Sequence, residues 1–194
     1  MFLDTSSLVA PDELNGDLLL MESRTSVRRI TSHLLEQGRT LPGFIGDISY
    51  AQSNRERYEG FCQALTDAGK KVDSSLCLTT PLGIDTYREE IDTFLSSLSR
   101  MPDAFVCASD YVACILMQLL EKRGLRVPED VAVSGFDNNT EDLLAEHLTT
   151  VQVFNEELGA RLALQILYRI KYPNTPHEVT YLGTNVLYRD STGD

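Results

Sequence analysis

The sequence predicts an α/β protein with a doubly wound, mainly parallel sheet. Short apolar runs alternate with amphipathic segments almost throughout the 194 residues. Strands that alternate with helices of roughly 10 to 15 residues imply right-handed crossovers, which place helices on both faces of a parallel sheet. Glycines at Gly38, Gly69 and Gly124 follow helical patterns and support the same assignment.

The chain begins with two apolar runs that a polar insert separates. We expect strands at Met1–Leu3 and Leu18–Met21. Two strands with no helix between them are not expected to make the edge of a parallel sheet, because parallel neighbours need a crossover connection. This region is therefore predicted to be the remnant of a larger unit.

From residue 23 onward, helices and strands alternate. Apolar residues recur at helical spacing in each helix, and short apolar runs mark the strands. The predicted helix faces contain Val27, Ile30 and Leu34; Tyr58, Phe61 and Leu65; Tyr87, Ile91 and Leu95; Val112, Ile115 and Leu119; and Leu158, Leu162, Ile166 and Ile170. The predicted strands lie at Phe44–Ile45, Leu76–Leu78, Ala104–Cys107 and Val131–Val133.

Local patterns predict how several helices begin. Ser53–Glu56 and Thr86–Glu89 match the capping box, in which the first side chain accepts a helical amide and the glutamate reaches back. Ser109 or Asp110 is placed to cap the next helix.

The end of the chain has a different pattern. A loop from Asp137 to about His147 precedes the last predicted helix. Beyond that helix, the runs Val179–Leu182 and Asn185–Tyr188 are expected to form a hairpin over Gly183–Thr184.

Composition excludes several classes of protein. Hydrophobic residues make up 42% and charged residues 24%, as in ordinary globular domains. No apolar run approaches the ~20 residues of a membrane span, and the start has no pattern of a secretory signal. The four cysteines are far apart without a CxxC pair, which indicates reduced thiols in a cytoplasmic protein and no zinc site or disulfide framework.

The charge balance argues against direct binding to DNA. Seventeen basic residues stand against 29 acidic ones, a net charge of -12, whereas a nucleic-acid surface needs a clustered basic face. Arg24, Arg28 and Arg29 form one local basic cluster, and their helical spacing favours a solvated face.

Polar side chains follow three of the predicted strands, and ligands of open parallel sheets lie outside these carboxyl ends. The residues are Ser53 and Arg57, Ser109 and Asp110, and Asp137 with Asn138. One guanidinium and two carboxylates at one edge could bind a polyol or a sugar. The alternatives stay open, because Asp110 could only cap a helix, Asp137 could only shape a turn and Arg57 could be solvated.

Patterns that indicate catalysis are absent from the sequence. The three histidines, His33, His147 and His177, are scattered, and none has a cysteine or a second histidine at ligand spacing. No nucleophile elbow, phosphate-binding loop or dinucleotide fingerprint occurs. We therefore expect a binding protein without catalytic residues, metal or cofactor.

A string of motifs resembles the lactose-repressor (LacI/GalR) family of bacterial transcription regulators. They occur in order, at the spacing typical of that family, over essentially the whole chain. The motifs are His33–Gly38, Arg57–Phe61, Pro102–Asp110, Gly124–Asn138, Leu148–Val151, Leu158–Gly159 and Leu187–Thr192.

The resemblance implies a partial effector module. In the family, a helix-turn-helix and a hinge precede two α/β subdomains, which are joined by three crossovers and hold the effector between them. By this resemblance, residues 1–22 are remnant strands of the first subdomain and residues 23–152 are the second. Residues 153–176 contain the helix that returns to the first subdomain, and residues 177–194 are the closing hairpin of the second. The DNA-binding headpiece and most of the first subdomain are expected to lie outside the chain.

Carried over by position, the resemblance makes Arg57 and Asp137 effector-binding residues. Asp110 with Ser109 falls where relatives contact sugar hydroxyls, and Ser53 lies four residues before the family arginine. The chain departs from the family pattern at Met21–Glu22, where an Asp-Asn pair is common, and one polar contact to the effector is thereby lost.

The resemblance thus implies a sensor of a sugar or sugar phosphate in a repressor, reaching operator DNA only through the absent headpiece. A homodimer is expected, with no membrane contact. The alternatives are a sugar-binding protein of a transport system, which has the same fold, and a small-molecule enzyme on this scaffold.

Overall fold

Four parallel strands form the central sheet of the larger part of the molecule. The computed structural model describes residues 1–5, 7–83, 85–139 and 146–194. The sheet has the order β4-β3-β5-β6, with every neighbouring pair parallel, which confirms the predicted fold class. Its strands are β3 (Pro42–Ile45), β4 (Cys77–Leu78), β5 (Ala104–Cys107) and β6 (Ala132–Ser134).

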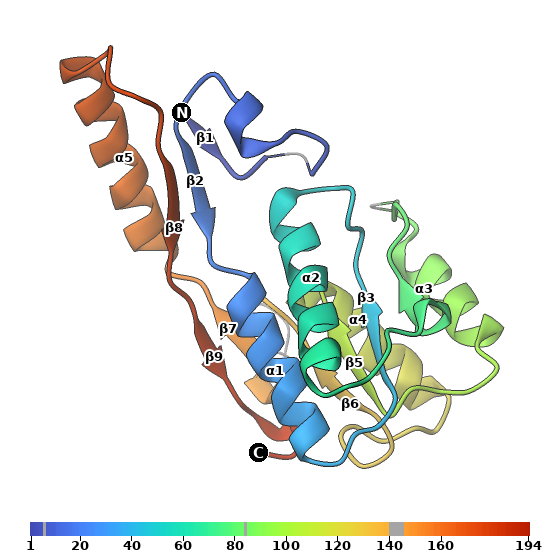
Figure 1. Cartoon of the computed structure of the whole chain (residues 1–194). Coiled ribbons are helices and arrows are strands. Elements are labelled where there is room, and N and C mark those ends of the chain that lie inside the picture. The colour runs from blue at the N-terminus through green and yellow to red at the C-terminus, as the bar shows by residue number, and fades with distance from the viewer. Residues whose placement is uncertain (6, 84, 140–145) are drawn as a thin grey trace.

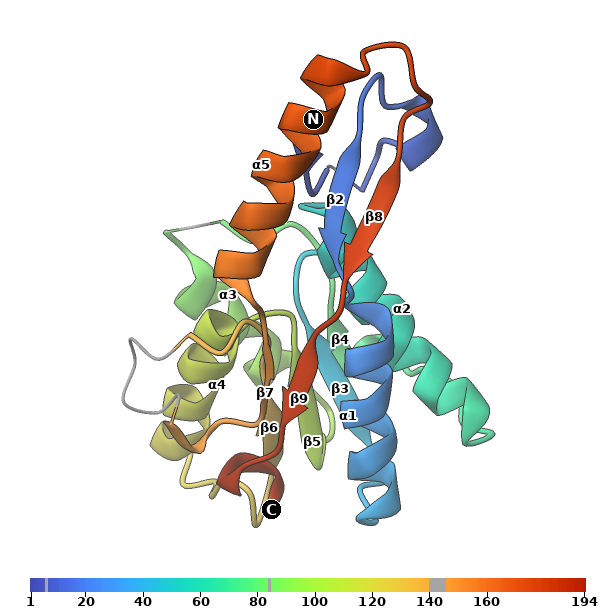
Figure 2. The same cartoon turned by 90° about the vertical axis from the view of Figure 1, so that its left-hand side faces the viewer.

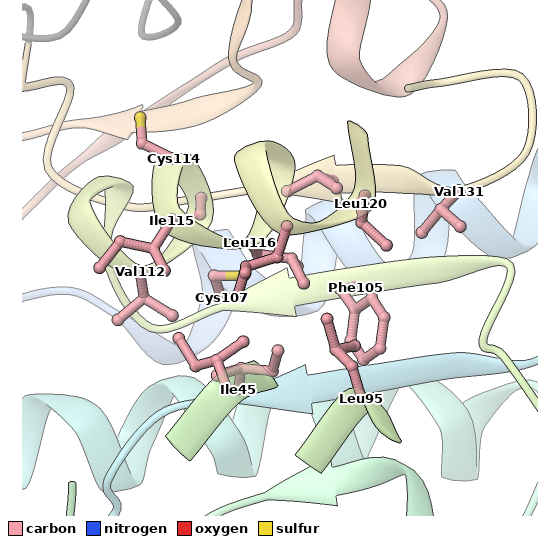
Figure 3. Packing of buried hydrophobic residues seen from close by; sticks show 14 of the residues in the cluster. Ile45, Leu95, Phe105, Cys107, Val112, Cys114, Ile115, Leu116, Leu120 and Val131 are labelled. Carbon is pink, nitrogen blue, oxygen red and sulfur yellow. The ribbon is translucent and has the colours of Figure 1, made fainter. Parts of the chain in front are cut away.

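Helices cover both faces of this sheet (Figure 1). They are α1 (Arg24–Glu36) and α2 (Gln52–Asp67) on one face, and α3 (Tyr87–Ser97) and α4 (Asp110–Lys122) on the other. Phe44 of β3 turns toward α2, where its ring centroid lies 5.1 Å from that of Tyr58 and 5.6 Å from that of Phe61. Ile45 turns to the opposite face and packs among residues of α3 and α4 (Figure 3).

A second, smaller sheet stands at the opposite end of the molecule from the C-terminus (Figure 2). It has the order β1-β2-β8, all parallel, and α5 lies along it. The elements are β1 (Phe2–Leu3), β2 (Leu18–Met21), β8 (Val179–Leu182) and α5 (Asn155–Lys171). The expectation that the first two runs make no parallel edge was wrong, because the connection between them forms a 3-10 turn at Pro11–Glu13 and returns the chain to the start of the sheet.

The predicted closing hairpin is absent from the described structure. β8 pairs in parallel with β2, whereas β9 (Asn185–Leu187) pairs antiparallel with β7 (Thr150–Gln152) near the larger sheet. The chain runs on through Gly183–Thr184 without turning back, and Thr184 Oγ1 donates to the carbonyl of Glu22 over 2.8 Å. The prediction was wrong because the pairing partners of these strands are far away in the sequence, where a local turn pattern gives no information.

Three segments connect the smaller sheet to the larger part. They are the junctions of β2 with α1, of β7 with α5, and of β8 with β9. At the first, the Glu22 carboxylate accepts the amides of Thr25 and Ser26 at 2.6 and 3.2 Å, and so caps α1.

The two capping boxes were also predicted incorrectly, whereas Ser109 caps α4 by accepting the Val112 amide at 3.3 Å. α2 begins at Gln52, so Ser53 is already inside the first turn and its hydroxyl bonds elsewhere. Thr86 directly precedes α3, but its hydroxyl donates to the Glu90 carboxylate and does not accept a hydrogen bond from a backbone amide of the helix.

The face of α5 that packs on the sheet agrees with the predicted one only in the first half of the helix, where Leu158 is buried and Leu162 is half-buried. Leu158 and Gln165 are buried, whereas Ile166 and Ile170 of the predicted face are 42% and 73% exposed. Apolar residues occur on most sides of this helix, so periodicity does not single out the packed face. No helix in the described residues is long and apolar enough to cross a membrane.

Asp17 fixes α5 to the smaller sheet. Its carboxylate is 3% exposed and accepts hydrogen bonds from the Arg169 guanidinium, the Gln165 amide at 3.1 Å and the Glu178 backbone amide at 2.9 Å. Burial opposes ionisation, but these donors outweigh it and lower the pKa of Asp17 from 3.8 to about 2.

We predict that Asp17→Asn lowers the free energy of unfolding by about 2 kcal/mol at pH 7. Because the folded pKa is depressed, this stability is present above the unfolded pKa of 3.8 and is lost as the pH falls toward about 2. Urea unfolding at pH 7, 5, 4 and 3 checks it, with Asp12→Asn, an exposed carboxylate, as control. A deficit for Asp17→Asn that stays constant from pH 7 to pH 3 would contradict this assignment.

Candidate functional site

The strained backbone positions of the described chain lie at carboxyl ends of strands. Asp4 follows β1 with φ of 56°, and Asp137 and Asn138 follow β6 with φ of 109° and 51°; no other described non-glycine residue has positive φ. Such conformations cost on the order of 1 to 3 kcal/mol and persist where the surrounding structure enforces them. Side chains from both places reach the amino-terminal half of α2, which marks this region as the candidate site.

Arg57, in the second turn of α2, is the centre of the site. The residue is 5% exposed. Its Nη1 donates to the carbonyl of Ala108, and its guanidinium carbon lies 3.7 Å from the ring centroid of Phe136. Its Nε has no hydrogen-bond partner, so one buried donor remains available.

Asp137 is the acidic partner of Arg57. Its Oδ1 lies 3.6 Å from Nη2 of Arg57, and the Asp137 side chain is 43% exposed. Burial of the carboxyl raises its pKa, and the guanidinium acts in the opposite direction. The two residues therefore present a buried cation and an accessible carboxylate side by side.

Burial also lowers the pKa of the Arg57 guanidinium from its ordinary value. The carboxylates of Asp137, Asp4, Asp110 and Glu56 oppose this effect by attraction. The Arg57 cation thus lies within the field of four acidic side chains. A second cation, Arg189, donates from Nη2 to Oδ1 of Asn138 over 2.8 Å and acts on Asp110, so acids still outnumber cations at the site.

Ser53 connects α2 to the smaller sheet. Its Oγ donates to Oδ2 of Asp4, and its amide donates to Oδ1 of Asp4 at 3.4 Å. The amide of Gln52 donates to the carbonyl of Thr5 at 2.7 Å. The first amides of α2, which a helix leaves unpaired, are thus satisfied by residues after β1.

A second contact joins the same helix to β8. The hydroxyl of Tyr181 donates to Oε1 of Glu56 over 2.8 Å. Burial and this hydrogen bond raise the pKa of Tyr181 to about 12. Glu56 is 3% exposed. The predicted capping box would have paired its side chain with Ser53, but in the structure it accepts from Tyr181.

Ser109 and Asp110 lie at the start of α4, where their side chains are engaged within the chain. Asp110 is 2% exposed; it accepts the Thr150 hydroxyl at 2.6 Å and the Asn139 amide at 2.7 Å. Burial raises its pKa to about 6, against the effect of these hydrogen bonds. Asp110 thereby holds the segment after β6 against β7, while Ser109 caps α4.

The structure brings Arg57 and Asp137 together, with Ser53 one turn before Arg57 on α2. Sequence reasoning missed Asp4, Glu56 and Phe136. Asp4 could have been predicted from the sequence, because it directly follows an apolar run. The rule that ligands lie at the carboxyl ends of parallel strands, which selected Asp137, applies equally to Asp4. Glu56 and Phe136 were read only as a helix cap and as part of a strand end. Part of the predicted loop, residues 140–145, lies outside the described residues.

The arrangement is suited to hydrogen bonding with a ligand. Within the described residues, no group of three or more His, Cys, Asp or Glu side chains could hold a metal ion. The guanidinium offers fixed donors, and the carboxylates accept from neighbouring hydroxyls.

Known proteins with a similar sequence are regulators of transcription. Residues 31–192 match the family described as periplasmic binding protein-like domain. The regulator DegA of Bacillus subtilis is 32% identical over 146 residues, 74% of this chain and 42% of its own length. CelR of Thermobifida fusca is 32% identical over 170 residues, 84% of this chain and 48% of its own length. The chain spans about half the length of these curated relatives.

Solved structures agree with these relatives. A putative LacI-family regulator from Sanguibacter keddieii superimposes with a TM-score of 0.83 at 26% identity, over 99% of this chain and 72% of that one. The complex of the regulator CelR with cellobiose superimposes with a TM-score of 0.82 at 28% identity, over 92% and 55% of the two chains. The chain therefore belongs to the periplasmic binding protein-like domain family, as the effector-binding region of a LacI-family transcriptional regulator.

Proposed function

We propose that this chain is the effector-sensing part of a bacterial transcriptional repressor. It binds a small polyhydroxylated molecule between its two sheets and acts on DNA through a headpiece that this chain does not contain. The relatives with the same fold are regulators, and one of them is similar in structure while holding cellobiose. Because a regulator of transcription works where the DNA is, a cytoplasmic location is part of this proposal.

The observation that carries the proposal is the pairing of Arg57 with Asp137 beside the contact of Asp4 with Ser53. The first pair belongs to the larger part of the molecule, whereas the second spans both sheets. A ligand bound there touches both parts at once. It can therefore favour one relative arrangement of the two sheets over another, which is what an allosteric effector must do.

The charges favour a neutral sugar over a sugar phosphate. The guanidinium of Arg57 already contacts Asn54, Ala108, Phe136 and Asp137. A phosphate group would meet the surrounding carboxylates, and each like-charge contact at about 6 Å costs on the order of 2 to 3 kcal/mol at an effective dielectric constant near 20. Neutral hydroxyls instead donate to the carboxylates and accept from the free Nε of Arg57.

The predicted site residues then have different roles. Arg57 and Asp137 contact the effector, and Asp4 is added to them. Asp110 and Ser109 are positioning residues, because their side chains are engaged in holding the segment after β6 and in capping α4. Ser53 transmits binding to the smaller sheet through Asp4.

Regulators are favoured over transport proteins because curated relatives of this chain are regulators of transcription. The coding sequence upstream of Met1 tests this choice. A helix-turn-helix in the same reading frame is expected, and a lipoprotein signal there would assign the chain to a transport system. We also propose that the protein forms a homodimer, because a repressor that carries paired DNA-binding headpieces contains two copies of the chain.

We predict that neutral sugars bind this chain at the Arg57 site with weak affinity, on the order of 1 mM, because the chain spans only about half the length of its curated relatives. An NMR titration with glucose and cellobiose should shift the amide signals of Ala108 and Phe136. Asp137→Asn should weaken binding at least tenfold, whereas the control Asp12→Asn should leave it unchanged. Shifts caused by glucose 6-phosphate but by neither neutral sugar would refute the proposed effector class.

We further predict that Asp4→Gly releases the start of α2, since glycine keeps the positive φ but removes the carboxylate. The Ser53 amide should exchange with solvent about tenfold faster, because its charged acceptor is worth on the order of 1.5 kcal/mol or more. The Val112 amide, capped by Ser109, is the internal control. Unchanged exchange at Ser53 would show that Asp4 does not hold this helix.

A further inference from the structure

The side chain of Asn138 links separate segments of the larger part of the molecule. Its Nδ2 donates to Oε1 of Gln152 over 2.6 Å, and its Oδ1 accepts from Nη2 of Arg189 over 2.8 Å. Its backbone amide donates to the Thr150 hydroxyl over 3.2 Å. The residue directly after Asp137 is thus joined by its side chain to the end of β7 and to the segment after β9.

Asn138 lies where the unusual conformation of Asp137 needs support. The two residues have successive positive φ angles, 109° at Asp137 and 51° at Asn138, which few non-glycine residues adopt. The amide of Asp137 donates to the carbonyl of Val151 over 3.1 Å, and its backbone forms an isolated bridge with Gln152. The side-chain bond between Asn138 and Gln152 therefore supports the backbone pairing that holds the Asp137 carboxylate in the site.

Gln152 lies where two of the three connecting segments leave the larger part. It is the last residue of β7, and its antiparallel partner is Asn185, the first residue of β9. Beyond this pair, one segment runs to α5 and the other comes from β8 (Figure 2). The Gln152 side chain also donates to the carbonyl of Val153, the next residue toward α5, over 2.7 Å. A shift of Gln152 therefore reaches both segments where they begin.

Arg189 braces Asn138 from the other side. Its Nη1 donates to the carbonyl of Leu148 over 3.0 Å, and its backbone amide donates to the Thr149 hydroxyl over 2.8 Å. These bonds hold the guanidinium within the larger part. Asn138 is thus placed between a fixed donor and the residue from which the two segments leave.

We propose that Asn138 is a positioning residue that passes effector binding at Asp137 to the two connecting segments beyond Gln152. This inference rests on the proposed function, in which the effector contacts Asp137. A ligand that displaces the Asp137 carboxylate also moves the adjacent Asn138, and the hydrogen bond to Gln152 carries this movement onward. Because the two segments connect the two sheets, the ligand then favours one relative arrangement of the sheets over another.

Amide exchange of the chain without ligand tests the first step. Gln152→Ala removes the acceptor of Asn138 and should speed exchange of the Asp137 amide about fivefold, as expected for the loss of one hydrogen bond. Gln152→Glu keeps that acceptor and should restore most of the protection. Asn185→Ala, an exposed change in the same residue pair, is the matched control and should leave the rate unchanged.

An NMR titration with cellobiose tests the second step. In the parent chain, cellobiose should shift the amide signals of Ala108 in the site and of Val153 beyond it. Asn138→Gly removes the side chain but keeps the positive φ. In this variant at saturation, the shift at Ala108 should persist, and the shift at Val153 should fall about threefold because its coupling to the site is weakened.

The outcomes separate this inference from the proposed function. Equal exchange of the Asp137 amide in Gln152→Ala and in the parent chain would overturn it. An undiminished shift at Val153 in Asn138→Gly would overturn it as well, while leaving the effector site in place. If cellobiose shifts no signal of the parent chain, the proposed function fails, and the exchange rates alone decide whether Asn138 positions Asp137. Circular dichroism and urea unfolding establish that each variant is folded.

Discussion

The unpaired amides at the start of α2 are the constraint on which the site depends. A helix leaves its first amides without partners, and here Asp4 and Thr5 of the smaller sheet satisfy those of Gln52 and Ser53. Arg57, one turn further on, is thereby held at the junction of the two sheets, where it meets Asp137. The contact that completes the helix is also the contact that joins the two parts of the molecule.

A buried guanidinium needs carboxylates around it, and this requirement determines the chemistry of the site. Removing water from Arg57 is costly, and Asp137 together with the field of the other acids offsets that cost. Because the acids outnumber the two cations Arg57 and Arg189, we infer that the site suits hydroxyl groups better than anions. Backbone strain at Asp4 and Asp137 fits the same account, since both residues are held in unusual conformations where their carboxylates face α2.

The sequence predicted what depends on local pattern or on a general rule of parallel sheets. The rule that ligands lie at the carboxyl ends of parallel strands selected Arg57 and Asp137, and the structure brings these two side chains together, whereas their contact with an effector stays a prediction. The hairpin over Gly183–Thr184 was wrong because the partners of its two strands are distant in sequence. The capping box at Ser53 was wrong for the same reason, since its acceptor is Asp4. The second half of the packed face of α5, Ile166 and Ile170, was misassigned because the helix is apolar on most of its sides.

The most direct measurement is a crystal structure of this chain grown with a neutral sugar at high concentration. The account predicts sugar hydroxyls within hydrogen-bond distance of both the Arg57 guanidinium and the Asp137 carboxylate, with the ligand also reaching the segment that follows β1. Density for the sugar elsewhere on the molecule, with Arg57 still contacting only its partners within the chain, Asn54, Ala108, Phe136 and Asp137, would contradict it.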